Sequence, residues 1–243
     1  MILIILASGR GSRLGKVTNT KPKCLINIYK NKTLIDYLSE KFELFSKVIV
    51  VTGYKSKILK KKLTSKKIIF VENKKYQNTN MVESLMLCKT LINNDLIISY
   101  ADIFYDDNIL RKLNKLKGNF LPLNKNWLNS WKKRYGSLVE IKNDAEDLVT
   151  KNKKIISLSG KIKNKLPKYQ YMGIVKLTKQ SFIKLYNYYK ALKNSNVSMT
   201  EFLNLAIKNK KIILKYKAFN NFWYEVDNKK DLELLKNEIK NLI

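Results

Sequence analysis

The first half of the chain alternates short, continuous apolar runs with helical patterns. Such runs occupy residues 2–6, 48–52, 68–71 and 96–99. A strand that is buried on both faces of a parallel sheet has this composition. Between the runs, a helical pattern covers 34–45, 55–63, 80–91 and 106–116. This alternation predicts an α/β fold, built on a Rossmann-like, doubly wound sheet with right-handed crossovers.

The second half of the chain has a different pattern, with shorter strands and more turns. Strands are predicted at 137–141, 154–158, 172–177 and 212–216. Helices are predicted at 180–192, 199–207 and 232–242. Residues 124–135 show no clear period and are interpreted as a loop beside a functional site. Because no linker is evident, we expect a single domain, 1–243, with halves 1–123 and 124–243 and a β-rich insertion that makes the sheet mixed.

The charge of the chain is strongly positive, but its pattern does not favour nucleic acid. Lys and Arg total 49 and Asp and Glu total 19, which gives a formal net charge of +30. Only four basic residues are Arg, the residue best suited to bidentate recognition of bases and phosphates. The lysines are scattered, as a biased composition would place them. A partner among nucleic acids or membranes is therefore not expected.

Two absences narrow the chemistry further. Histidine is missing, which excludes Ser-His-Asp and Cys-His catalysis and any imidazole general base. No apolar run reaches the length that spans a bilayer, and the run at 2–6 is too short for a signal-peptide core. A cytoplasmic location is the expectation.

A glycine-rich turn follows the first predicted strand, in the sequence LASGRGSRLG at residues 6–15. Gly9 and Gly11 let the backbone approach a ligand closely, and successive N–H groups in such a turn can bind an anion. Arg13 adds a planar cation that suits phosphate. The spacing fits neither a Walker A loop nor a Rossmann fingerprint, and an ordinary tight turn would also be glycine-rich.

Lys21-Pro22-Lys23-Cys24-Leu25 follows the turn, so that G-x-G-x-R-L precedes P-K-x-L by about ten residues. This pair of motifs resembles the nucleotidyltransferase family, which makes nucleotide sugars and CDP-alcohols. The resemblance implies that Lys23 binds phosphate and that Arg13 contacts the leaving pyrophosphate. It also implies the nucleotide-diphospho-sugar transferase type of fold.

Two carboxylates stand where a metal site would be expected. Asp102 follows the fourth predicted strand, at the end of the sheet where ligands bind in α/β folds. Asp227 precedes the last predicted helix and shares an extended segment with Glu225. Taken singly, Asp102 suits a turn and Asp227 a helix N-cap. The resemblance assigns Asp102 and Asp227, with Glu225 alongside, to Mg²⁺.

Further segments resemble the phosphocholine cytidylyltransferase-like branch of the family. They are T-N-x-x-x-S-L at 79–85, the segment 171–174 and the segment 223–227. Residues 144–146 and 199–200 resemble a capsule-associated subgroup of that branch. The resemblance implies transfer of CMP from CTP to a small phosphorylated acceptor, with release of pyrophosphate, for capsule or surface-polysaccharide modification. Half 1–123 would bind the nucleotide and half 124–243 the acceptor.

Two sets of residues are predicted to contact the substrates. The nucleotide set is Leu6, Ala7, Ser8, Gly9, Gly11, Asn80, Ser84 and Ala101. The acceptor set is Glu83, Trp127, Trp131, Asp144, Glu146, Tyr171 and Trp223. The aromatic members suit a quaternary amine, as in a phosphocholine-like acceptor, and the acidic members suit the amine of an amino-acid acceptor such as phosphoglutamine. Core packing of the aromatics and solvated turns at the acids are the structural alternatives.

Two other functions are consistent with parts of the sequence. The first is a sugar-1-phosphate nucleotidyltransferase, which would share the first-half motifs. The second is a non-catalytic basic protein that binds nucleic acid, which rests on net charge alone. The sequence leaves the oligomeric state open between a monomer and a homodimer.

Overall fold

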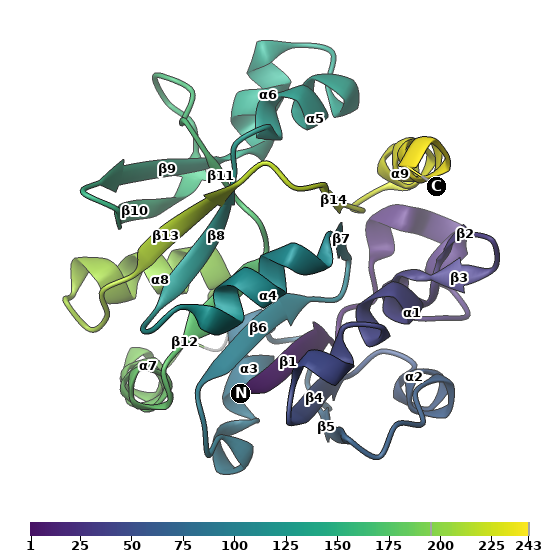
Figure 1. Ribbon diagram of the computed structural model, residues 1–243, viewed down its shortest axis with the longest axis horizontal. Coiled ribbons are helices and arrows are strands. Elements are labelled where there is room, and N and C mark those ends of the chain that lie inside the picture. The colour runs from purple at the N-terminus through teal and green to yellow at the C-terminus, as the bar shows by residue number, and fades with distance from the viewer. Residues whose placement is uncertain (195, 243) are drawn as a thin grey trace.

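The computed structural model describes residues 1–194 and 196–242, without the side chains of 241 and 242. One large mixed sheet has the strand order β5-β4-β1-β6-β12-β8-β13-β10-β9, with β11 paired to β8 (Figure 1). Its strands are β1 (Ile2–Ala7), β4 (Lys47–Thr52), β5 (Ile68–Glu72), β6 (Leu96–Tyr100), β8 (Phe120–Asn124), β9 (Glu146–Lys151), β10 (Lys154–Lys161), β11 (Gln170–Tyr171), β12 (Ile174–Leu177) and β13 (Lys215–Phe219).

Two short strand pairs and the helices complete the fold. The pairs are β2 (Asn27–Tyr29) with β3 (Lys32–Thr33), and β7 (Ile103–Tyr105) with β14 (Trp223–Glu225). The α-helices are α1 (Leu34–Ser39), α2 (Ser56–Lys62), α3 (Met81–Met86), α4 (Asp107–Lys115), α5 (Trp127–Arg134), α6 (Leu138–Asp144), α7 (Lys179–Leu192), α8 (Met199–Lys208) and α9 (Lys229–Leu242). Short 3-10 helices lie at Ser12–Thr18, Lys23–Leu25, Phe42–Leu44 and Lys89–Leu91.

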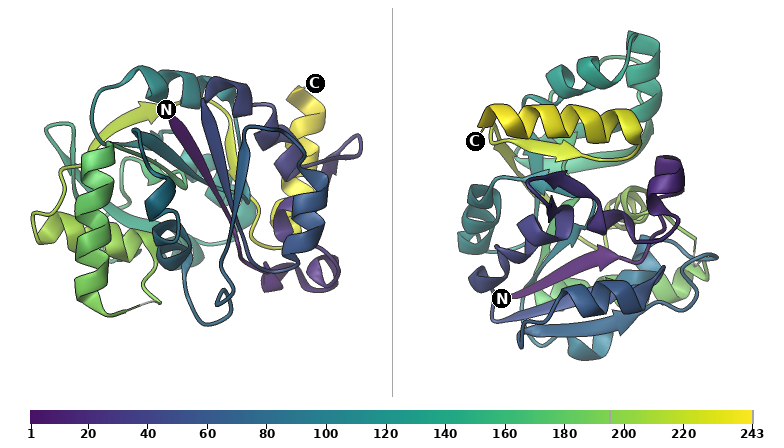
Figure 2. Two further views of the ribbon diagram at one scale, coloured as in Figure 1. Left: turned by 90° about the horizontal axis from the view of Figure 1, so that it is seen from below. Right: turned by 90° about the vertical axis from the view of Figure 1, so that its right-hand side faces the viewer.

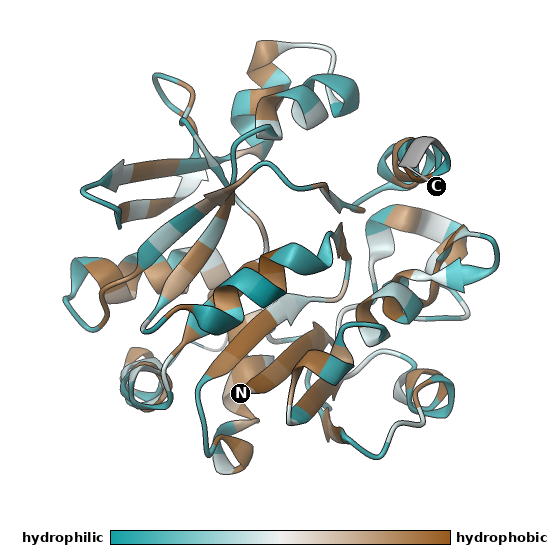
Figure 3. Ribbon diagram, in the orientation of Figure 1, coloured by the Kyte–Doolittle hydropathy of each residue, from teal (hydrophilic) through white to brown (hydrophobic). Residues whose placement is uncertain are grey.

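The centre of the sheet is made by the apolar runs of the first half. Strand β1 pairs in parallel with β4 on one side and with β6 on the other. All six residues of β1 are buried, as are all five of β6. Hydropathy colouring accordingly concentrates the apolar residues on these strands (Figure 3). The apolar runs at 2–6, 48–52 and 96–99 therefore marked strands covered on both faces, as predicted. For the run at 68–71 the prediction is wrong in this respect, because it forms the edge strand β5, in which no residue is buried.

The second half of the chain adds both antiparallel and parallel strands to this sheet. Strand β12 pairs antiparallel to β6, whereas β13 pairs in parallel with β8. Strand β8 crosses the predicted boundary between residues 123 and 124, so the same sheet runs through both halves. The predicted class, a Rossmann-like doubly wound mixed sheet, is confirmed.

The C-terminal helix returns to the N-terminal part of the chain. Helix α9 lies beside the β2–β3 hairpin in Figure 1. Its apolar face joins a second, smaller core with Leu14, Ile26, Ile28 and Leu34. The left view of Figure 2 shows α9 and α2 at the opposite end of the molecule from α7 and α8. This packing fixes the segment that leads into α9, which carries Asp227.

The predicted strand at 137–141 is wrong, because this segment is part of helix α6. The side chain of Ser137 accepts a hydrogen bond from the N–H of Glu140 at 3.2 Å. The Glu140 carboxylate in turn accepts the N–H of Ser137 at 3.0 Å. This reciprocal capping box starts a helix, and the S-x-x-E spacing was its signal in the sequence.

The interpretation of 124–135 as an irregular loop is also wrong, because residues 127–134 form helix α5. Trp127, Trp131 and Arg134 are its buried residues. They stand at positions i, i+4 and i+7, which is the spacing of one helix face. Arg134 lies on the buried face although it is charged. Because a charged residue is not expected at a buried position, the helical period of this segment could not be recognised from its apolar residues alone.

Other differences concern boundaries and short strands. Helices α1 and α3 end earlier than predicted and are continued by 3-10 turns, and strand β13 lies at Lys215–Phe219, later than the predicted 212–216. Strand β8 was not predicted; it contains Pro122, a residue that is unusual inside a sheet. Within the described residues, no helix combines the length and apolarity needed to cross a bilayer.

We expect Gly173→Ala to destabilise the fold strongly. Gly173 has φ +69°, and a Cβ there would lie 2.8 Å from Cδ2 of the buried Tyr100. An L-residue at positive φ costs about 1 kcal/mol, and overpacking adds roughly 1–3 kcal/mol. Urea denaturation should therefore show a loss of about 2–4 kcal/mol in the free energy of unfolding.

Gly160→Ala is the matched control, because Gly160 has φ +79° and a Cβ there would meet none of the described atoms within 4 Å. It should lose only the backbone contribution, about 1 kcal/mol. Equal losses in the two variants would show that contact with Tyr100 does not matter.

Candidate active site

Two adjoining cavities open at the carboxyl ends of β1 and β6. The first has a volume of about 300 Å³ and the second about 270 Å³. They share four lining residues: Arg13, Met81, Tyr100 and Asp227. The carboxyl edge of an α/β sheet is the usual place for ligands, so these two cavities are the candidate substrate sites.

Most of the predicted nucleotide-binding residues line the first cavity. They are Leu6, Ala7, Ser8, Gly9, Gly11 and Ala101, together with Arg13, Lys23, Asp102 and Asp227. Gly11 has φ +72°, and a Cβ there would lie 2.8 Å from Cβ of Lys23. The turn therefore needs glycine for its conformation and for the close approach of Lys23.

Lys23 lies between the two aspartates that the sequence singled out. Its Nζ is 2.8 Å from Oδ2 of Asp102 and 3.1 Å from Oδ1 of Asp227. Burial alone would lower the pKa of Lys23, but the two carboxylates outweigh it and raise that pKa, so the ammonium stays charged.

Arg13 approaches the same aspartate from the solvent side. Its Nη2 donates to Oδ1 of Asp227 at 2.9 Å, although 67% of the Arg13 side chain is exposed. Burial would raise the pKa of Asp227, but Lys23 and Arg13 hold it below its ordinary value. Because Arg13 lines both cavities and most of its side chain is exposed, the guanidinium could contact a phosphate there while it pairs with Asp227.

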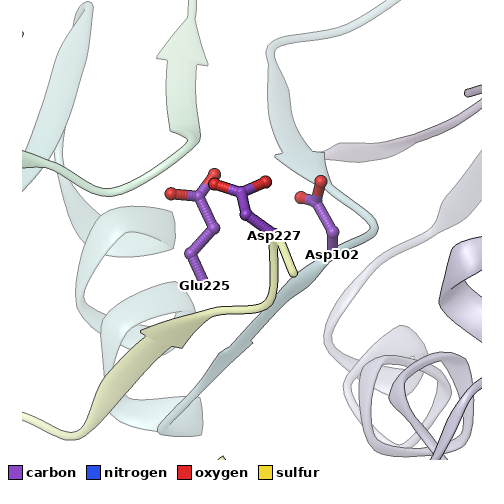
Figure 4. Close-up of side chains that lie close together, drawn as sticks. All are labelled: Asp102, Glu225 and Asp227. Carbon is purple, nitrogen blue, oxygen red and sulfur yellow. The ribbon is translucent and has the colours of Figure 1, made fainter. Parts of the chain in front are cut away.

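Asp102, Glu225 and Asp227 form an acidic cluster. Pairing of β14 with β7 places Glu225 opposite Ile103, and the N–H of Val226 donates to the carbonyl oxygen of Asp102 at 3.0 Å. One carboxylate oxygen from each acid lies within 4.8 Å of the others, and Figure 4 shows the three groups turned toward one space.

The cluster fits a divalent cation. The Oδ1 atom of Asp102 is buried and has no hydrogen-bond partner within the described part of the chain. Burial, and repulsion from Asp227 and Asp102, raise the pKa of Glu225 well above its ordinary value. Hard oxygen ligands of this kind suit Mg²⁺, which commonly takes a few carboxylates and keeps several waters.

The second cavity has an aromatic wall and acidic groups. Trp131, Asp144, Glu146, Tyr171, Trp223 and Glu225 line it, so most of the predicted acceptor residues meet there. The rings of Trp131 and Trp223 stack with centroids 5.9 Å apart and planes 3° from parallel. Their N–H groups donate to Asp144 at 2.9 Å and to the carbonyl oxygen of Met172 at 2.9 Å, which fixes both rings.

Four predicted contact residues line neither cavity. Asn80 caps α3 through a bond from the N–H of Met81, and Ser84 shares a 2.9 Å bond with Ser8. Glu83 accepts the hydroxyl of Tyr189 at 2.6 Å, and Trp127 donates to the carbonyl oxygen of Pro167 at 3.2 Å. Each polar group is used by the fold, and Ser84 supports a residue that lines the first cavity.

Several residues of the site were not predicted from the sequence as site residues. Gln170, Ser198 and Thr200 line the second cavity, and Gln170 donates to the carbonyl oxygen of Glu146 at 2.7 Å. Arg134 and Asp231 form a buried ion pair behind Asp227. Arg134 is one of only four arginines in a lysine-rich chain, and that rarity was the signal available.

Two cytidylyltransferases are similar to this chain in sequence. The chain is 36% identical to the CTP:phosphoglutamine cytidylyltransferase of Campylobacter jejuni, over 96% of this chain and 98% of the relative. It is 30% identical to the choline-phosphate cytidylyltransferase of Streptococcus pneumoniae, over 66% and 68% of the two chains.

A similar fold is known from a solved structure. The inositol-1-phosphate CTP transferase from T. maritima superposes with a TM-score of 0.76 at 20% identity, over 98% of this chain and 96% of the other. The family profile described as nucleotidyl transferase matches residues 2–241, which is nearly the whole sequence. The chain therefore belongs to the nucleotidyl transferase family.

Proposed function

We propose that this chain is a cytidylyltransferase that transfers CMP from CTP to a small phosphorylated acceptor and releases pyrophosphate. The observation that carries the proposal is the acidic cluster with Lys23 and Arg13 at the junction of the two cavities. A nucleotide in the first cavity and an acceptor in the second would meet at that junction. The similarity to the Campylobacter jejuni enzyme supports CTP as the nucleotide.

The reaction needs positioning and charge neutralisation more than proton transfer. The second pKa of a phosphate monoester is about 6, so near neutral pH the acceptor is already a nucleophile. Lys23, Arg13 and the N–H groups of the glycine-rich turn would hold the triphosphate in line. A chain without histidine is sufficient for this chemistry.

We also propose that Asp102, Asp227 and Glu225 hold Mg²⁺. When bound, the ion would neutralise phosphate charge that develops in the transition state. The support is the orphaned, buried oxygen of Asp102 and the convergence of three carboxylates.

The second cavity favours an acceptor with a cationic amine. Trp131 and Trp223 offer stacked faces, and Asp144 and Glu146 offer negative charge. Both a quaternary amine and the amine of an amino acid would satisfy these groups, so phosphocholine-like and phosphoglutamine-like acceptors remain the two candidates. A sugar 1-phosphate would offer Glu146 no cationic partner, whereas Asp144 already has Arg134 Nη1 at 3.9 Å.

The cellular setting is proposed from the sequence alone. We propose a cytoplasmic enzyme whose partners are CTP and its acceptor, with no nucleic acid or membrane partner. The resemblance to a capsule-associated subgroup supports a role in capsule or surface-polysaccharide modification.

Asp102→Ala and Asp227→Ala should each lower kcat by about a thousandfold, because several kcal/mol of charge stabilisation would be lost. Pyrophosphate release is measured with CTP, Mg²⁺ and a panel of phosphocholine, phosphoglutamine and sugar phosphates. Glu43→Ala, at an exposed carboxylate far from the site, should behave as wild type. Undiminished product formation in EDTA, or activity with sugar 1-phosphates only, would contradict the proposal.

Lys23→Met tests whether the Lys23 ammonium and a divalent ion neutralise the same two carboxylates, Asp102 and Asp227. Without the ammonium, Asp102 and Asp227 lose their shared partner, and the metal-free protein should lose about 3 kcal/mol of stability. Added Mg²⁺ should then raise the melting temperature of the variant more than that of the wild type. Equal Mg²⁺ effects on the two proteins would show that the lysine and the ion act independently.

Glu146→Gln tests the amine contact through its pH dependence. Burial raises the pKa of Glu146, although a hydrogen bond from Thr200 opposes this. As pH falls through that raised pKa, the carboxylate is protonated and loses its attraction for an amine, so the KM for the acceptor should rise toward acid pH.

In Glu146→Gln the rise of the acceptor KM toward acid pH should disappear. At pH 8 the acceptor KM should be about tenfold higher than in the wild type, and the KM for CTP should be unchanged. Glu201→Gln is the control, because Glu201 is exposed at the start of α8 and does not line the second cavity. A Glu146→Gln variant with the wild-type acceptor profile would exclude this contact.

A further inference from the structure

Arg134 is a buried cation that contacts acids on both sides of the site. It ends helix α5, and only 2% of its side chain is exposed. Its Nε lies 2.9 Å from Oδ1 of Asp231, and its Nη2 lies 3.1 Å from the other oxygen of that carboxylate. The same Nη2 is 3.4 Å from Oδ2 of Asp227, and Nη1 is 3.9 Å from Asp144.

Asp231 anchors the backbone from which Asp227 projects. Its Oδ2 accepts the N–H of Asp227 at 2.9 Å and the N–H of Asn228 at 3.1 Å. The side chain of Asn228 in turn accepts the N–H of Asp231 at 3.0 Å, which completes the cap of α9. Asp231 is fully buried, so this arrangement cannot exchange its partners for water.

The two oxygens of Asp227 therefore have separate partners. Oδ1 faces Lys23 and Arg13 in the first cavity, while Oδ2 faces Arg134. Contact on one oxygen fixes the rotation of the carboxylate and leaves the other directed at the cavity.

Arg134 also reaches the wall of the second cavity. Its guanidinium carbon lies 5.0 Å from the ring centroid of Trp131, whose N–H donates to Asp144. A cation over an indole face is favourable, and the contact holds the ring that stacks on Trp223.

We propose that Arg134 is a positioning residue, which holds Asp227 in the orientation that binds the divalent ion and holds Trp131 in the wall that receives the acceptor. The inference rests on the proposed metal site at Asp102, Glu225 and Asp227. Arginine is required, because its planar guanidinium donates to both carboxylate oxygens of Asp231 and to one oxygen of Asp227 at the same time. A lysine ammonium cannot reproduce this arrangement.

A purely structural link between α5 and α9 is the competing explanation, and the chain supplies a matched control for it. Lys133, the neighbour of Arg134, pairs with Glu238 across the same two helices. About half of its side chain is exposed, and it lines neither substrate cavity. Lys133→Ala therefore removes a bridge between the helices without touching Asp227.

The experiment measures Mn²⁺ binding by electron paramagnetic resonance in the presence of CTP, together with kcat and both KM values. Loss of a group that orients a metal ligand typically weakens metal binding or activity about 10–100-fold. Arg134→Lys should show that loss in Mn²⁺ affinity and a higher acceptor KM, while the KM for CTP changes by less than about threefold. Lys133→Ala should match wild type in all four quantities.

Asp231→Asn provides a second variant should Arg134→Lys fail to fold. It keeps the shape of the α9 cap but removes the charge that holds Arg134, and it should weaken Mn²⁺ binding in the same way. Wild-type Mn²⁺ affinity in a folded Arg134→Lys or Asp231→Asn protein would overturn the inference, as would an equal loss in Lys133→Ala. A wild-type protein that binds no Mn²⁺ with CTP would overturn the proposed metal site and the inference with it.

Discussion

The three-residue pairing of β14 with β7 determines whether this molecule has a site at all. Asp102 follows a strand in the first half, and Glu225 and Asp227 stand near the C-terminus. The β14–β7 ladder, with the hydrogen bond from the N–H of Val226 to the carbonyl oxygen of Asp102, brings one carboxylate oxygen of each acid within 4.8 Å of the others. Helix α9 then secures the segment by packing on the N-terminal hairpin. The site is thus closed by contacts between the two ends of the chain.

Opposite charges are arranged so that each side of the junction suits a different ligand. On the side of the first cavity, Lys23, Arg13 and the glycine-rich turn offer positive potential for phosphates. On the side of the second cavity, the carboxylates of Asp144 and Glu146 offer negative potential. Asp227 lies between them and contacts three cations: Lys23, Arg13 and Arg134. Such a buried arrangement is tolerable only when nearly every charge has a partner, which the network provides.

The parts of the fold that the sequence predicted are those whose cause is local. Strands β1, β4 and β6 were predicted because burial on both faces leaves a continuous apolar run. Asp102 could be singled out because it follows a buried strand at the edge of the sheet where ligands bind in α/β folds. Lys23 was singled out only by the resemblance of its motif to the nucleotidyltransferase family.

The parts that were missed depend on distant partners. Strands β7 and β14 have three residues each and are stable only through each other. Helix α5 carries a buried charge that is acceptable only because Asp231, far along the chain, neutralises it. The sequence of α5 itself contains nothing that predicts the pairing with Asp231. The helix α6 is different, since its capping box was visible in the sequence and was outweighed by the β-branched and apolar residues beside it.

The aromatic wall of the second cavity has a practical consequence. The chain contains three tryptophans, and all of them belong to this wall or lie directly behind it: Trp127, Trp131 and Trp223. The tryptophan emission of the protein therefore originates beside the second cavity and not beside the first. A fluorescence titration would read the occupancy of one cavity in the presence of the other substrate, without any label attached to the protein.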